Sequence, residues 1–340
     1  MKSPWTPSGS FRGGDVWGEK VSEEQLAATS YQVSSDRGQV LGPLSIKKRV
    51  LNIRLVNEQK EVGEREEDIA AALMSAAKGL FATFLTEDGS GVDYARLARS
   101  DEFGSYCKLS EQLALLEHST IDSWDVSQKK AFWLNIYNSL LIHAVALWGE
   151  PAWVGSRLFL FSCASYRIGG MDLSLNEIEH GILRGNKKVP SPMGKPPFRE
   201  GSDRLNLSLP LDPRVHMAMN CGARGCPPIR FYRGEAVEKQ LDMACRGFNH
   251  GLEIDEEGFL MLSQIYQWYI DDFGGDAKSV LKFIQGHVSM ATHQEAVAKQ
   301  LALLNPKLRF QKYDWNLNST SKTTRTPSFR SLSLKSMSGI

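Results

Sequence analysis

The chain has 340 residues, of which 42% are hydrophobic and 23% charged, and its formal net charge is +1. This composition is typical of a globular protein with a sizeable core. The near-zero charge gives no indication of nucleic acid or an anionic membrane surface as a partner. The sequence has no secretory signal pattern at its start, and no apolar run reaches the roughly 18 residues of a membrane span without polar interruption.

Five cysteines, at positions 107, 163, 221, 226 and 245, are odd in number and widely spread. They fit neither a disulfide framework nor a zinc site, because the one close pair has no second ligand pair at a matching distance. A redox-labile disulfide between Cys221 and Cys226 is an alternative that no other sequence feature supports. We therefore expect a reducing, cytoplasmic location, with no metal and no cofactor.

Residues 1–60 are rich in Gly, Ser and charge and are predicted to be mostly disordered or a linker, with a weak strand within 44–56. Hydrophobic residues then recur with helical spacing over 64–85, which predicts an amphipathic helix. A second helix is predicted over 102–116.

The next predicted helix, over 130–148, reads KAFWLNIYNSLLIHAVALW and is apolar on nearly every face, as is typical of a buried helix. Asn135, Asn138, Ser139 and His143 fall within about 140° of one another and form a polar stripe. Each buried polar group without a hydrogen bond costs about 1–3 kcal/mol. The stripe must therefore face polar partners inside the core.

The segments that follow this helix are predicted to be strands and helices in alternation. Strands are predicted over 162–168, 204–211 and 214–221, with a tight turn at Gly169–Gly170 and a hairpin over 252–262. Helices are predicted over 174–185, which opens with a capping box, over 235–249, and twice more after the hairpin. A surface loop is expected over 186–201, and a strap that docks the C-terminal strand on the core over 313–318. A disordered tail is expected over 319–340.

Glu179 projects from the middle of the apolar face of the predicted helix over 174–185. A carboxylate among aliphatic side chains is either paired or has a raised pKa. Glu179 is thus a candidate general acid or base, or a structural acceptor for buried donors such as Asn135 and Asn138. Glu177, His180 and Arg184 are predicted on the opposite face, in solvent or against a loop.

Cys221 ends a predicted strand beside a Gly-rich turn, which makes it a candidate nucleophile; the alternative is a small buried residue. Strand geometry argues against His216 as its partner, because on a strand His216 points to the opposite face about 17 Å away. The base would then be His143 or His180, with Asn138 or Asn135 orienting it.

The contacts of the stripe distinguish a catalytic from a structural role. We expect Asn135 and Asn138 to meet Glu179 or the Asn220–Cys221 strand end. A His143 side chain that points at Cys221 would indicate a catalytic site, whereas one that points at a backbone carbonyl would indicate a structural stripe.

Four ordered segments resemble the family known as domain of unknown function 547: KKAFWLNIYNSLLIHAV, YRIGGMDLSLNEIEHGILR, DPRVHMAMNCGARGCPPIR and YDWNLN. The resemblance covers about residues 65–318 and implies one domain over 61–318. Plant members often carry an N-terminal leucine zipper, but no zipper heptads appear in this sequence. The expected fold is α+β, mainly helical, with a small mixed or antiparallel sheet packed on the central helix.

That architecture is loosely similar to the papain and transglutaminase group, by analogy of fold alone. Members of that group carry their nucleophilic cysteine at the start of the central helix. In this chain the equivalent residues, 128–132, contain no cysteine. We expect an intracellular protein-interaction or scaffold module with a protein partner. The alternative is a cysteine-dependent hydrolase or transferase that uses Cys221 and a histidine base. The sequence leaves open whether the chain is an enzyme and how it oligomerises.

Overall fold

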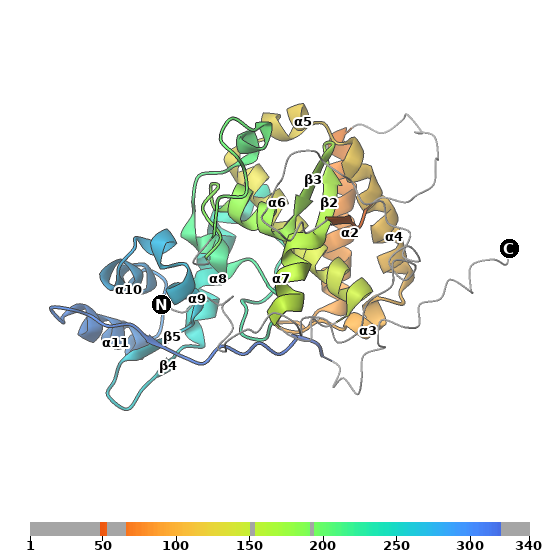
Figure 1. The fold of residues 1–340 in the computed structure, drawn as a ribbon. Helices are drawn as coiled ribbons and strands as arrows, with labels where there is room; N and C mark the ends of the chain where they lie inside the picture. Colours follow the sequence, from red (N-terminus) through yellow and green to blue (C-terminus); the bar gives the residue numbers. More distant parts are fainter. Residues whose placement is uncertain (1–47, 53–65, 150–153, 191–193, 321–340) are drawn as a thin grey trace, which may run out of the picture.

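A computed structural model describes residues 48–52, 66–149, 154–190 and 194–320. The fold is α+β and mainly helical, with two small mixed sheets, as the sequence predicts (Figure 1). The predicted disorder over 1–47, 53–60 and 321–340 lies outside the described residues. The limits proposed for the domain therefore stay predictions.

The first helices surround α6 (Val126–Trp148), the predicted buried helix. They are α2 (Glu66–Phe84), α3 (Tyr94–Leu97), α4 (Asp101–Glu111), the 3-10 helix η1 (Gln112–Leu115) and α5 (His118–Ser123). The helices predicted over 64–85 and 102–116 correspond to α2 and to α4 with η1. Their apolar spacing places one face of each against the core, including Leu73, Leu80, Phe84 and Phe103.

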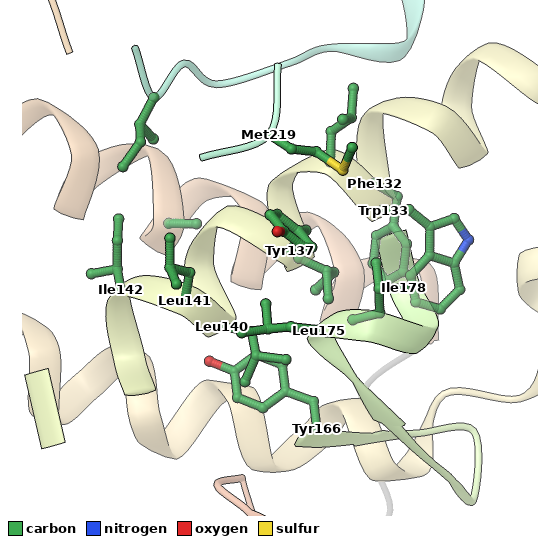
Figure 2. Close-up of a cluster of buried hydrophobic side chains, with 14 of the residues drawn as sticks. Phe132, Trp133, Tyr137, Leu140, Leu141, Ile142, Tyr166, Leu175, Ile178 and Met219 are labelled. Atoms are coloured by element: carbon green, nitrogen blue, oxygen red, sulfur yellow. The ribbon is translucent and has the colours of Figure 1, made fainter. Parts of the chain in front are cut away.

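Helix α6 forms the centre of the core. Every side chain from Lys130 to Val145 is buried, and the helix begins with a capping box between Asp125 and Gln128. By length and composition α6 could cross a membrane, but 83% of its most apolar stretch is buried inside the protein. Figure 2 shows Tyr137, Leu140 and Leu141 of α6 between Met219 on one side and Tyr166 on the other. The helix is therefore the core helix of a folded domain.

The first sheet has the order β1-β2-β3 and lies beside α6. Strand β1 (Arg49–Val50) is parallel to β2 (Ala164–Ile168), and β3 (Met171–Ser174) is antiparallel to β2. Gly169 and Gly170, with φ of 56° and 76°, form the predicted turn between β2 and β3. Helix α7 (Val154–Cys163) leads into this sheet.

The second sheet has the order β4-β5-β6 and includes the predicted hairpin. Strand β4 (Glu253–Ile254) is antiparallel to β5 (Leu260–Leu262), and β6 (Arg309–Phe310) is parallel to β5. Its neighbouring helices are α8 (Val237–His250), α9 (Ile265–Trp268), the 3-10 helix η6 (Ile270–Phe273), α10 (Ala277–Gln285) and α11 (Ala291–Leu301). Figure 1 shows α9, α10 and α11 together at one end, away from α2 and α4.

The strands predicted over 204–211 and 214–221 are wrong. These segments contain two 3-10 helices, η3 (Asp203–Leu207) and η4 (Pro213–Met217), followed by irregular backbone; a third, η5 (Gly234–Ala236), precedes α8. The Asp212 carboxylate accepts a hydrogen bond from the Arg214 amide, and Pro213 occupies the first helical position. Capping and the restricted φ of proline thus favour a helical turn over the strand that residue alternation suggests.

Two groups of buried side chains make up the core. The larger surrounds α6, and the smaller includes Leu260, Tyr266, Val280 and Ile284. The segment 313–320 runs from the smaller group back to the larger, as Figure 1 shows.

The predicted strap over 313–318 is confirmed by the bonds of Asn318. Its N–H donates to the Gly222 carbonyl, its carbonyl accepts from the Val92 amide, and its side chain accepts from Tyr94 Oη. Ser319 pairs with Val92 in a β-bridge, so the predicted tail over 319–340 begins with a residue that is held in place.

Candidate functional site

The two asparagines of the stripe bind main-chain groups. Asn135 donates from Nδ2 to the Tyr232 carbonyl at 2.8 Å and accepts from the Tyr232 amide at 2.9 Å. Asn138 donates to the Ala218 carbonyl and accepts from the Asn220 amide, both at 3.0 Å. The expected contact with the Asn220–Cys221 segment is confirmed for Asn138 but not for Asn135, whose hydrogen bonds go to Tyr232 and to neither Glu179 nor that segment. Each asparagine acts as an amide clamp that holds irregular backbone against α6.

His143 faces neither Cys221 nor a backbone carbonyl. Its Nδ1 lies 2.8 Å from Tyr166 Oη, and its Nε2 lies 3.5 Å from Cys107 Sγ. Burial lowers the pKa of His143 to about 3, so the ring is neutral at pH 7. The structure therefore places His143 with a different cysteine from the one the sequence suggested.

Glu179 lies in η2 (Glu177–Leu183), a π-helix that the Ser174–Glu177 capping box precedes. Tyr137 Oη donates to Glu179 Oε2 at 2.8 Å, and Tyr269 Oη donates to Oε1 at 2.6 Å. Burial opposes ionisation of Glu179, but His180, Tyr269, Arg184 and Tyr137 together keep its pKa below the ordinary value. Glu179 is thus an ionised carboxylate in the core, and its donors are tyrosines instead of the expected asparagines.

The face of η2 predicted to be exposed is buried as well. Glu177, His180 and Arg184 are 5%, 1% and 3% exposed, so their predicted solvent position is wrong. Lys48 and Arg204 contact Glu177, and Asp272 contacts Arg184. A helical wheel cannot predict this burial, because the residues that cover the face are distant from η2 in the sequence.

Arg184 connects η2 to a second acidic residue. Its Nε and NH2 donate to Asp272 at 2.6 and 3.1 Å, and its NH1 lies 2.7 Å from His180 Nδ1. Burial and the Arg184 charge lower the pKa of His180 to about 4, although Glu179 acts to raise it. His180 is therefore neutral at pH 7 and is fixed between Arg184 and Glu179.

His216 lies on the other side of Asp272. Its Nε2 is 2.8 Å from Asp272 Oδ2, and its ring lies against that of Tyr269, with centroids 4.0 Å apart. Burial lowers the pKa of His216 although Asp272 acts to raise it. Burial opposes ionisation of Asp272, but His216 and Arg184 hold its pKa well below the ordinary value. The pair is therefore a neutral imidazole beside a carboxylate.

Cys221 and Cys226 are joined by a disulfide, with their Cα atoms 6.2 Å apart. Both residues are half-buried, and Tyr313 Oη lies 2.9 Å from Cys226 Sγ and 3.5 Å from Cys221 Sγ. The bond occupies the sulfur that the nucleophile hypothesis needs as a thiol. That hypothesis therefore applies to the reduced protein.

Within the described residues, Glu179, His216, Cys221 and Cys226 border a small cavity of about 50 Å³. His216, and not His143 or His180, borders it together with Cys221. The predicted strand that turned His216 away from Cys221 does not form, because residues 213–217 are the 3-10 helix η4. The remaining wall is largely aromatic: Tyr137, Phe161, Trp268, Tyr269, Tyr313 and Trp315.

The sequence indicated Glu179 and Cys221 but missed Tyr269 and Asp272. These two belong to the segment 265–273, which packs on η2 only in the tertiary structure. No local pattern marks them. Within the described ranges, no group of three or more His, Cys, Asp or Glu side chains is arranged to hold a metal ion.

Fold and site together define a mainly helical α+β domain in which a buried acid–base cluster and a cystine border an aromatic cavity. Residues 121–248 match the family model described as protein of unknown function, DUF547, which supports a domain of this family in that part of the chain. The match includes α6, η2 and the disulfide. Neither the curated proteins nor the solved structures contain a match to the chain.

Proposed function

We propose that the chain is a cysteine-dependent hydrolase or transferase in which Cys221 of the reduced protein is the nucleophile and His216 the general base. One observation carries the proposal: Cys221 and His216 border the same cavity, and His216 is hydrogen-bonded to Asp272 behind it. A nucleophile, a base and a group that orients the base are the parts that thiol catalysis requires. Asp272 is then a positioning residue.

The protonation states support this assignment of roles. Asp272 is ionised and can only accept, so His216 Nε2 carries the proton of the hydrogen bond between them. His216 Nδ1 is then left as an acceptor on a ring that is neutral at pH 7. Such a ring can remove the proton of a thiol.

In the proposed step, the proton of Cys221 Sγ passes to His216 Nδ1 while the sulfur attacks an acyl carbon. The bond to the leaving group breaks, and the leaving group takes the proton from His216. Water or an amine then attacks the thioester and gives its proton to His216, which passes it to the departing Cys221 sulfur, so that the acyl product and the thiol are released. Hydrolysis and transfer differ only in which acceptor attacks.

The step needs a free thiol, and therefore prior reduction of the disulfide to two thiols by two electrons and two protons. A thiol reductant in a reducing compartment supplies both. The proposed activity thus fits the cytoplasmic location expected from the cysteine pattern, and that location is part of the proposal.

Thiol labelling tests the proposal. The Cys226→Ser variant leaves Cys221 as a permanent thiol, and mass spectrometry follows iodoacetamide uptake at each cysteine at about pH 6.5. We expect Cys221 to react at least about tenfold faster than free cysteine, and His216→Gln in the same background to remove most of that gain. Cys107 in the same sample is the internal control.

Labelling of Cys221 only after unfolding would overturn the proposal. So would an equal Cys221 rate with and without His216→Gln. Circular dichroism of each variant shows whether it remains folded.

A scaffold or protein-interaction module is the second candidate. The observation that favours it is the pairing of the buried polar groups: both asparagines clamp main chain, and both Glu179 oxygens accept from tyrosines. Such a paired network also serves a purely structural role. The module predicts slow labelling of Cys221 that His216→Gln does not change, and a protein partner retained by Cys221→Ser.

A further inference from the structure

The mouth of the cavity is built from stacked aromatic rings. Trp268 and Trp315 lie 5.3 Å apart at 28°, and Tyr313 lies 4.8 and 4.6 Å from them. Both tryptophans are half-buried. The negative faces of such rings attract cations, and indole attracts them most strongly.

The buried part of the cavity wall is rich in acceptors. Tyr137 and Tyr269 use their hydroxyl protons on the two Glu179 oxygens, and all three residues border the cavity. Their oxygens therefore have only lone pairs left to offer a ligand. A ligand that complements this wall must donate hydrogen bonds.

Among the described residues, the ion-pair contact of Glu179 is with His180, whose Nδ1 lies 3.5 Å from Glu179 Oε1. Arg184 forms its hydrogen-bonded ion pair with Asp272, and His180 beside Glu179 is neutral at pH 7. The aromatic rings nearby also hold cations, since the Arg157 guanidinium lies 5.5 Å from the Trp315 ring and that of Arg184 lies 4.7 Å from Tyr269. The wall thus offers a positive group of a ligand the Glu179 carboxylate and aromatic rings of a kind that already contact cations in this protein.

We propose that the cavity binds a primary alkylammonium group, the end of a lysine side chain or a small amine, between Glu179 and the Trp268–Trp315 rings. Its N–H groups would donate to the Glu179 and tyrosine oxygens, and its charge and alkyl stem would lie against the indoles. A volume of about 50 Å³ admits a group of a few heavy atoms. A quaternary ammonium fits less well, because it has no N–H to donate.

The inference does not depend on the thiol chemistry, because neither cysteine supplies a hydrogen bond to the ammonium. The Cys221→Ser/Cys226→Ser double variant should therefore bind the amine as well as the parent does. If Cys221 shows no fast reaction with iodoacetamide but the protein still binds the amine, the proposed function is overturned and the amine site is not. Loss of amine binding in the folded double variant would overturn the inference.

Calorimetry and tryptophan fluorescence of the full chain test the site with butylammonium chloride at constant ionic strength. We expect butylammonium to bind roughly tenfold more tightly than butan-1-ol, its uncharged counterpart, or tetramethylammonium. The amide of Nα-acetyl-lysine, tested beside butylammonium, distinguishes a lysine side chain from a free amine as the source. Equal binding of butan-1-ol or of tetramethylammonium would overturn the proposal.

Variants localise the site. Glu179→Gln should weaken butylammonium binding roughly tenfold, whereas Glu235→Gln, on the surface, should leave it unchanged. If circular dichroism shows that Glu179→Gln is unfolded, Trp268→Leu at the mouth provides the same test, with the same expected loss. Unchanged affinity in a folded variant at either position would overturn the assignment.

Discussion

At the scale of single residues, His143 couples the stability of the fold to pH. Its ring lies between Tyr166 and Cys107, and burial lowers its pKa from the ordinary 6.5 to about 3. As the pH falls below about 6.5, the unfolded chain binds a proton at this position before the folded chain does. Stability is therefore lost between pH 6.5 and about pH 3.

Comparison with His143→Leu isolates this contribution. Between pH 7 and pH 5 the parent should lose about 2 kcal/mol of unfolding free energy more than the variant does. Urea denaturation at both pH values measures the difference. An equal loss of unfolding free energy in the parent and in His143→Leu would show that His143 does not titrate as its burial requires.

The residues of the site show what a sequence can report. Glu179 and Cys221 could be predicted because each is locally anomalous, a carboxylate on an apolar face and a cysteine before a Gly turn. Asp272 and Tyr269 could not be predicted, since they reach the site only through tertiary packing. His216 was excluded by a wrong local structure, and its role depends on the 3-10 helix η4.

At the scale of elements, the close packing of η2 depends on Gly181. A Cβ built at Gly181 would lie 2.5 Å from the buried ring of Phe198, whereas one at Gly79 in α2 meets nothing within 4 Å. Gly181→Ala should cost about 1–3 kcal/mol of stability through overpacking. Gly79→Ala should add about 0.5–1 kcal/mol, because alanine favours the helix.

Thermal denaturation of the two variants measures both effects. Combining Gly181→Ala with Phe198→Leu should recover part of the loss if the ring is its cause. If Gly181→Ala is as stable as the parent, the segment 194–201 can shift away from the new methyl group with little loss of unfolding free energy.

Some elements could be predicted from the sequence and others could not. The long helices follow from periodic apolar residues, and the hairpin follows from a Gly turn between short apolar runs. The segments 204–211 and 214–221 could not be assigned, because alternation occurs there without strand partners. Caps at Ser202 and Asp212 decide their local structure instead.

At the scale of the molecule, the Arg184–Asp272 pair connects the two core groups. Arg184 follows η2, which packs in the larger group, and Asp272 precedes Phe273 of the smaller group. Both side chains are buried, at 4% and 0% exposed. Removing one charge leaves the other buried without compensation.

Asp272→Asn should therefore lower the unfolding free energy by about 3 kcal/mol, while Asp271→Asn next to it, on the surface, should change it little. Chemical denaturation followed by tryptophan fluorescence measures both. Equal stabilities of the two variants would show that the core groups are held together without this pair.

The strap has a consequence for the order in which the protein matures. Tyr313 and Trp315 border the cavity, yet they leave the ribosome after every other residue that does. A nascent chain can bury α6 and bring Glu179 and His216 into place, but its cavity still lacks one wall. We therefore expect the last side of the site to form when residues 313–320 fold back over the rest of the domain, and the proposed ligand to bind only after this segment has been synthesised.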